Sequence, residues 1–268
     1  MTRSCAGTSR AEVLLFVEGG SFFMLHDNYF EYYENIAHWT FDEYECREEC
    51  LTDWDLYKIL RSLAAPDSHI LDLGTAGGEK IFSEFPVCAE ILGTDYSPRM
   101  IGTARANLAA SGRQDVSFEV MDNLKMDVED EHYDIVVARH TCTDPAQIFR
   151  CLKSGGYLLM RGVDKYDCWD LKLAAGYGQG YNDPVPVSVS DYENVLRAGF
   201  TDVELVPIHT REYYRDAETL KAFLRVVPIL DHMPEASVLD SYISRNTYSG
   251  RVRLIRRFYG ITARKPLP

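Results

Sequence analysis

The sequence contains no long apolar run, no excess of basic residues and no closely paired cysteines. No stretch approaches the roughly 20 apolar residues that a membrane-spanning helix needs, so we expect no membrane partner. Lysine and arginine number 28 against 41 acidic residues, and a formal net charge of −13 argues against nucleic acid as a partner. The seven cysteines include no Cys-x-x-Cys pair, which favours free thiols in a reducing cytoplasm and no metal site.

No segment has the pattern of a secretory leader. The short apolar segment 11–17 contains Glu12 and is followed by Glu18-Gly-Gly instead of a small-residue cleavage site, so we expect no signal peptide. The composition itself is globular, with 46% hydrophobic and 26% charged residues in a chain of 268. This length suits one large domain with an appended cap.

From residue 64 onward, short apolar runs alternate with helical segments. Apolar runs bounded by turn residues predict parallel strands that are covered on both faces. The expected strands are 69–73, 89–95, 116–120, 133–138, 157–162, 202–209 and 251–265. Strands and helices that alternate at this spacing predict a doubly wound α/β sheet.

Three regions depart from this alternation. Residues 28–63 are rich in aromatic and acidic residues without an internal proline or glycine, and they predict helices with a boundary at Thr40. Residues 164–187 predict a long loop rich in glycine and aspartate, and such loops in compact domains are often functional. Residues 210–249 predict a helical insertion before the last strand.

The strongest motif is a glycine-rich turn between the first expected strand and its helix, in the segment ILDLGTAGGEK. Glycines there let a backbone approach a ligand closely. The turn is not a phosphate-binding P-loop, because Glu79 stands where that pattern needs lysine followed by serine or threonine. An acid and three small residues alternate along it as Asp72, Gly74, Ala76 and Gly78.

This turn resembles the acid-x-Gly-x-Gly-x-Gly loop of class I S-adenosylmethionine-dependent methyltransferases, from which Ala76 departs. The resemblance covers roughly residues 60–265. It implies S-adenosylmethionine as cofactor and a Rossmann-like, seven-stranded mixed sheet whose last strand is antiparallel. It divides the chain into an N-terminal segment with a helical cap, 1–63, and a cofactor-binding methyltransferase domain, 64–268.

The resemblance also assigns cofactor contacts. Asp95 ends the second strand about 20 residues after the turn, where a carboxylate can accept both ribose hydroxyls. Tyr96 and Met100 would line the adenine pocket, Asp122 would accept from the adenine amino group, and Met121 would pack on the ring. The full set expected at the cofactor is Asp72, Gly74, Thr75, Ala76, Gly78, Asp95, Tyr96, Met100, Met121, Asp122, Asn123 and Arg139.

His140 is the residue we expect to act in catalysis, because it follows the fourth strand at the edge where open α/β sheets bind ligands. An imidazole titrates near neutral pH and can take a proton from a hydroxyl or a thiol. A second interpretation leaves His140 as a packing or capping residue. Arg139 would hold the methionine carboxylate or an anionic acceptor, or would instead pair with Asp134 or Asp164.

Acceptor contacts are expected from three places. Tyr29 and Tyr33 share a helix face with Tyr32, which suits either core packing or an aromatic lid over a sulfonium. The other residues expected to contact the acceptor are Trp39, the loop residues Asp164 and Trp169, and His209 near the sixth strand.

We therefore expect methyl transfer from S-adenosylmethionine to a small-molecule acceptor, with oxygen slightly preferred over nitrogen, sulfur or carbon. Helical segments that cap the pocket favour a small molecule over a polymer. Two alternatives remain. Arginines 251, 253 and 257 could form a basic face for a tRNA or rRNA base, or the chain could bind the cofactor without catalysis. A homodimer is compatible with every one of these interpretations.

Overall fold

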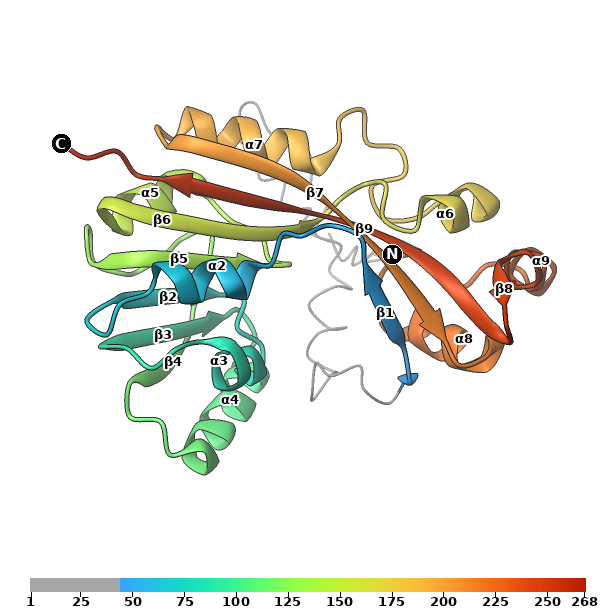
Figure 1. Cartoon of the computed structure of the whole chain (residues 1–268), viewed down its shortest axis with the longest axis horizontal. Helices are drawn as coiled ribbons and strands as arrows, with labels where there is room; N and C mark the ends of the chain where they lie inside the picture. The colour runs from blue at the N-terminus through green and yellow to red at the C-terminus, as the bar shows by residue number, and fades with distance from the viewer. Residues whose placement is uncertain (1–43) are drawn as a thin grey trace, which may run out of the picture.

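The computed structural model describes residues 44–268, which form one twisted sheet flanked by helices (Figure 1). The strands are β1 (Arg47–Cys50), β2 (His69–Leu73), β3 (Glu90–Asp95), β4 (Val116–Val120), β5 (Tyr133–Arg139), β6 (Leu152–Val163), β7 (Thr201–Tyr214), β8 (Thr247–Tyr248) and β9 (Arg251–Arg264). The helices are α2 (Leu56–Leu63), α3 (Glu79–Glu84), α4 (Pro98–Ser111), α5 (Pro145–Cys151), α6 (Trp169–Ala175), α7 (Val187–Arg197), α8 (Ala217–Val226) and α9 (Ala236–Asn246).

The sheet confirms the predicted doubly wound fold. Its order is β1-β7-β9-β6-β5-β2-β3-β4, with β8 added to β9. The strands β4, β3, β2, β5 and β6 are parallel, and β9 is antiparallel to both β6 and β7, as expected for the last strand. All seven predicted strands are present, and β1 and β8 enlarge the described sheet to nine.

The prediction of helix up to residue 63 is wrong for residues 47–50. These residues form β1, which pairs antiparallel with the far half of β7, from Arg47 opposite Tyr213 to Cys50 opposite Thr210. The long-range ladder therefore overrides the local helical pattern. Helix starts only at α2, where the Asp55 carboxylate accepts from the Lys58 N–H at 2.8 Å. The helices expected before residue 44, and with them Tyr29, Tyr33 and Trp39, lie outside the described residues.

Two boundaries in the second half of the chain also differ from expectation. The sixth predicted strand does not end at His209 but continues to Tyr214, because β7 stays paired with β9 through Tyr214 opposite Val252. The insertion between these strands is helical, as predicted, but its helices α8 and α9 begin only at Ala217. The expected loop 164–187 contains the short helix α6.

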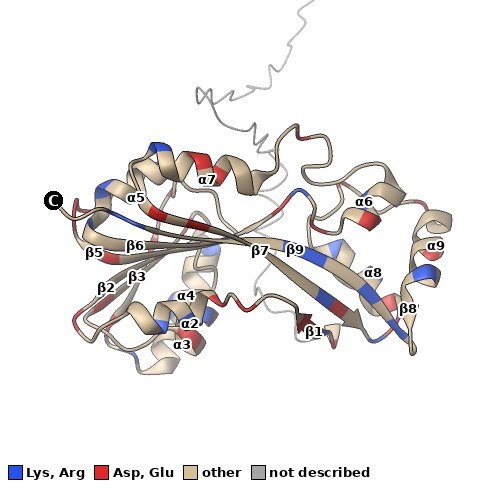
Figure 2. Cartoon of the chain, turned by 45° about the horizontal axis from the view of Figure 1, so that its top comes forward, with Lys and Arg blue, Asp and Glu red and all other residues tan. Residues whose placement is uncertain are grey.

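Three apolar cores hold the molecule together. One lies under α5 and α7, a second lies under α2, α3 and α4 on the other face, and a third joins α6, α8 and α9 to the far ends of β7 and β9. Figure 2 shows the long strands β7 and β9 running from the main sheet to this third core, with basic residues along β9. None of the helices within residues 44–268 has the length and apolar character needed to cross a membrane.

Candidate active site

The glycine-rich turn follows β2 at the carboxyl edge of the sheet. Its backbone is tied to the neighbouring strand, because the N–H groups of Gly74 and Thr75 both donate to the Thr94 carbonyl at 2.8 Å. Gly74 has φ +75°, and a Cβ there would lie 2.7 Å from the Cβ of Thr141. The turn, residues 74–78, is thus a tight backbone cradle, and a side chain larger than glycine at residue 74 would fill it. Such a cradle can hold an adenosyl group through backbone contacts.

Asp95 lies against the same turn. Its Oδ2 accepts from the Ala76 N–H at 3.0 Å and its Oδ1 accepts from the Ser97 N–H at 2.9 Å. These bonds fix the carboxylate beside the cradle, where the ribose of a bound nucleoside would lie. Ala76 has φ +51°, so the departure from glycine is accommodated in a left-handed conformation that an alanine rarely adopts. The bond to Asp95 helps to hold that conformation.

The remaining predicted adenine contacts differ in exposure. Tyr96 is 60% exposed, whereas Met100 and Met121 are buried at 3% and 8%. Met121 belongs to the core under α5 and α7, so its side chain also stabilises the sheet. The Asp122 carboxylate accepts from the Leu124 N–H at 2.9 Å, which orders the turn after β4.

A buried amide network joins three strand ends under the cradle. The Asn123 side chain donates to Thr141 Oγ1 at 3.0 Å and accepts from Thr94 Oγ1 at 3.2 Å. Asn123 was expected at the cofactor, but Thr94 and Thr141 were missed by the sequence analysis. Single threonines carry no spacing signal, and only the order of the parallel strands β5, β2, β3 and β4 brings them together with Asn123.

Asp72 is the buried acid of the motif, with 6% of its surface exposed. Burial raises its pKa from 3.8 to about 7, against the opposing effect of the Arg139 charge. Asp72 therefore takes up and releases a proton near neutral pH. A bound cation at the cradle would favour the ionised form.

His140 lies at the carboxyl end of β5 in a strongly cationic setting. Its backbone has φ +54°, its N–H donates to the Arg161 carbonyl at 2.8 Å, and its ring packs on Phe258 with centroids 5.4 Å apart. Desolvation and then the charges of Arg139, Arg161 and Arg256 hold the pKa of His140 well below its usual value. His140 as a residue is exposed to solvent, so an acceptor can reach it. The imidazole is neutral at physiological pH and can accept a proton.

The alternative ion pairs proposed for Arg139 do not form within residues 44–268. Asp134 instead binds Lys153 Nζ at 2.8 Å, and Asp164 accepts from the Ser188 hydroxyl. Arg139 lies beside Arg161 in the register of β5 and β6. The Arg161 guanidinium stacks 4.6 Å from the centre of the Phe258 ring, while its buried Nε has no hydrogen-bond partner. Arg161 thus keeps an unpartnered donor beside the Phe258 ring on which His140 packs, and this donor can bind an anion.

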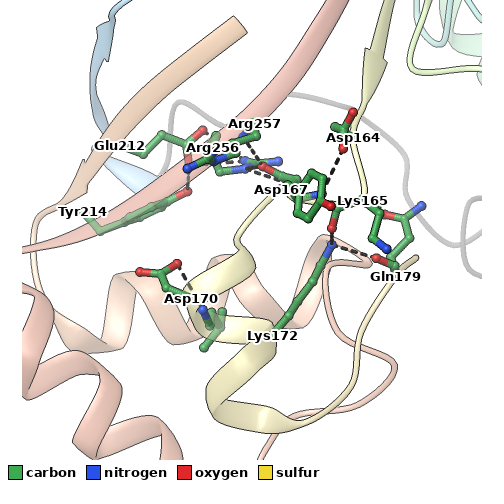
Figure 3. Close-up of polar contacts among 12 residues, drawn as sticks. Asp164, Lys165, Asp167, Asp170, Lys172, Gln179, Glu212, Tyr214, Arg256 and Arg257 are labelled. Atoms are coloured by element: carbon green, nitrogen blue, oxygen red, sulfur yellow. Dashed lines mark hydrogen bonds and ion pairs between the residues drawn. The ribbon is translucent and has the colours of Figure 1, made fainter. Parts of the chain in front are cut away.

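The loop after β6 is fixed by a buried ion network (Figure 3). Arg256 Nε donates to Asp167 at 3.0 Å, and its Nη1 donates to Glu212 at 3.0 Å. Asp167 also accepts from the Arg257 N–H at 2.7 Å, and Glu212 accepts from the Tyr214 hydroxyl at 2.7 Å. Because all three charged side chains are under 9% exposed, this network pins the loop to β7 and β9.

A cavity of about 240 Å³ opens beside this loop. Its walls include two of the predicted acceptor residues, Asp164 and His209, and the full lining is Asp164, Tyr166, Ser188, Leu205, Pro207, His209, Arg257, Phe258 and Tyr259. Trp169 reaches this region through an edge contact with Tyr166, at a centroid distance of 5.2 Å. The structure therefore brings three predicted acceptor residues together, and Phe258 connects their cavity to His140.

Comparison with known proteins identifies a methyltransferase domain within the chain. Residues 65–183 match the family described as "Methyltransferase domain". In a comparison with curated proteins, none matches the chain.

Among solved structures, a protein of Bacillus halodurans C-125 described as a methyltransferase is 19% identical, with a TM-score of 0.56 over 79% of this chain and 99% of that one. The YcgJ protein from Bacillus subtilis is 17% identical, with a TM-score of 0.51 over 80% and 98%. The [4+2]-cyclase SpnF is 18% identical, with a TM-score of 0.52 over 80% and 81% of the two chains. These three structures share the fold.

Residues 65–183 therefore form a methyltransferase domain, and the cradle with the carboxylate beside it fits the class I S-adenosylmethionine-dependent type. The chain is accordingly an enzyme that uses S-adenosylmethionine.

Proposed function

We propose that this methyltransferase acts on a small molecule, that the acceptor lies at the carboxyl edge beside Arg139, His140 and Arg161, and that oxygen is the methylated atom. The observation that carries the proposal is the packing of the His140 ring and of the Arg161 and Arg256 guanidinium groups on one aromatic ring, that of Phe258. S-adenosylmethionine, when bound, supplies an electrophilic methyl group on a good leaving group, so positioning of the acceptor contributes much of the rate.

The electrostatics of this site favour a hydroxyl over an amine. A neutral His140 can accept the proton that an acceptor hydroxyl loses, and the neighbouring arginines would stabilise the negative charge that develops on its oxygen. The same arginines repel an ammonium group. A carboxylic acid or an acidic hydroxyl on the acceptor would fit Arg139 and Arg161, because guanidinium groups bind such anions with two parallel bonds.

The arginines of β9 support a small acceptor more than an RNA. The Arg256 guanidinium is bound by the carboxylates of Asp167 and Glu212. The Arg253 guanidinium stacks on the Tyr248 ring and donates to Asn246 at 3.2 Å. Arg251 donates to backbone carbonyls of Glu45 and Tyr213. We also propose action in a reducing compartment such as the cytoplasm, since all six described cysteines are free thiols.

The first test is thermal unfolding with and without saturating S-adenosylhomocysteine. A ligand at 100 times its dissociation constant adds about 2.7 kcal/mol, which raises the unfolding temperature of a chain this size by several degrees. Methyl transfer is then measured on matched pairs of small acceptors that carry a hydroxyl or an amine. Preferential methylation of the hydroxyl members supports the proposal, whereas methylation of amines or of RNA alone overturns it.

The pH dependence of kcat/KM gives a second readout. With His140 as the base and S-adenosylmethionine held at saturation, so that Asp72 stays ionised, activity on a hydroxyl acceptor should rise with pH through a value below the ordinary histidine pKa and then stay level. His140→Gln should lower kcat and remove this acidic limb. An unchanged profile in the variant would assign His140 to packing.

A further inference from the structure

A cluster of metal-ligating side chains lies at the edge of the sheet opposite the cofactor site. His69 is the first residue of β2, Glu90 is the first residue of β3, and His132 directly precedes β5. These strands are neighbours in the sheet, with His69 in register with Glu90. The five residues of β2 separate this cluster from the glycine-rich turn, a distance of roughly 16 Å at the rise of a strand.

The three potential ligand atoms form a small triangle. His69 Nδ1 and His132 Nε2 are 3.1 Å apart, and Glu90 Oε2 lies 3.3 Å from the first and 2.9 Å from the second. Tetrahedral Zn²⁺ with bonds of about 2.0–2.1 Å places its ligand atoms about 3.3 Å from one another. A slight expansion of the triangle would therefore accommodate the ion.

Protons alone cannot satisfy this triangle. If only one imidazole nitrogen carries a proton, the bare nitrogen presents a lone pair to the carboxylate oxygen. If both are protonated, two N–H groups lie next to each other, and if neither is, every contact is between lone pairs. With Glu90 ionised, one of the three contacts is thus repulsive whichever imidazole nitrogens carry protons, whereas a cation in the centre makes all three favourable.

The surroundings also suit a cation. The Glu129 carboxylate lies 3.4 Å from the other ring nitrogen of His132, which is the arrangement that orients a metal-binding histidine. An adjoining cavity of about 460 Å³ is lined by His132 and the acids Glu90, Glu119, Asp127 and Glu129. The side chains of His69, Glu90 and His132 are 26–39% exposed, so an ion and a water ligand can enter from solvent.

We propose that His69, Glu90 and His132 bind a divalent transition-metal ion, with Zn²⁺ the best match, and that a water completes its coordination. The site would clamp the amino ends of three central strands and stabilise the fold without taking part in methyl transfer. We expected no metal because the cysteines lack the spacing of a zinc site. The ligands proposed here come from separate strands and have no motif spacing. The proposal is independent of the acceptor chemistry proposed above.

The test uses the full chain after removal of metals with a chelator. Titration with Zn²⁺ should show binding of one ion per chain, and the unfolding temperature should rise with Zn²⁺ concentration. His132→Gln and Glu90→Gln should each weaken Zn²⁺ binding at least tenfold. His232→Gln is the matched control, because this exposed histidine stacks on Tyr177 away from the cluster, and it should bind Zn²⁺ like the wild type.

Two further measurements distinguish this site from misfolding and from a thiolate site. Circular dichroism and unfolding of each metal-free variant report whether the fold is intact, so that lost binding is not confused with misfolding. Co²⁺ substitution should give a d–d spectrum without a thiolate-to-metal band, although Cys88 lies two residues before Glu90. A thiolate band, equal affinity in folded His132→Gln and wild type, or no binding of Zn²⁺ would each overturn the proposal.

Discussion

Replacement of Asp72 by asparagine should stabilise the protein without ligand at neutral and alkaline pH. Asp72 is buried at the end of β2 under the cradle, and its raised pKa shows that burial penalises the charged form more than its neighbours compensate. The unfolded carboxyl loses its proton near pH 4, whereas the folded one keeps it up to about pH 7. Between these values the unfolded state binds fewer protons, so the free energy of unfolding falls as pH rises.

The difference between 3.8 and about 7 corresponds to about 4 kcal/mol at alkaline pH, an upper bound for a carboxyl near Arg139. Asparagine has nearly the same shape and no charge to bury. The stability advantage of Asp72→Asn should therefore grow by about 2–3 kcal/mol between about pH 5 and about pH 8. The same variant should bind S-adenosylmethionine at least tenfold more weakly, because the cationic cofactor loses a carboxylate partner.

The assay is urea unfolding of both proteins at the two pH values, with binding followed by calorimetry. Asp115→Asn is a control of opposite sign, because the hydrogen bond from Arg113 holds the pKa of Asp115 below its usual value. That carboxylate contributes stability above its unfolded pKa, so its removal should destabilise the protein at both pH values. A wild-type stability that does not fall with pH relative to Asp72→Asn would refute the reasoning about Asp72.

Three more substitutions test the site. Asp95→Ala should weaken S-adenosylmethionine binding at least tenfold by calorimetry, since the carboxylate beside the cradle is lost, and unchanged affinity would remove Asp95 from the ribose. His140→Ala should lower turnover while cofactor affinity stays within about threefold, a change below roughly 1 kcal/mol; an unchanged rate would exclude a base at this position. Gly74→Ala should strain the turn, because the backbone there has a positive φ and the new Cβ would contact Thr141. It should lower the free energy of unfolding by about 1–3 kcal/mol, measured by urea unfolding, and remove most cofactor binding, measured by titration.

Local patterns predicted the parts of the fold that are locally determined. Each parallel strand is a short apolar run between turn residues, and the cofactor turn needs residues that tolerate positive φ, so both leave a signal in the sequence. The sequence of residues 47–50 gives a misleading signal for helix. Their helical composition is overridden by pairing with β7, more than 150 residues away, and no short window contains that partner.

The residues of the site also divide into those that local patterns predict and those that they do not. The sequence could predict Asp95 and His140 at the carboxyl edge, because Asp95 ends one predicted strand and His140 closely follows another. Arg161 and Arg256 could not be predicted, because their importance depends on strand neighbours: Arg161 lies beside Arg139, and Arg256 lies between two buried acids. Sequence order alone does not show which strands are adjacent in the sheet.

The length of β7 and β9 connects the cap to the chemistry. Each strand has 14 residues, so it runs from the main sheet into the core of α6, α8 and α9 without interruption. Arg256 lies along this span, and its bonds to Asp167 and Glu212 join the loop after β6 to both strands. The Arg256 guanidinium also lies 4.8 Å from the Phe258 ring, on which His140 and Arg161 pack. Phe223 of α8 completes the connection, because its ring centre lies 5.6 Å from the same guanidinium, so the helical insertion supports the proposed acceptor site through Arg256 and Phe258.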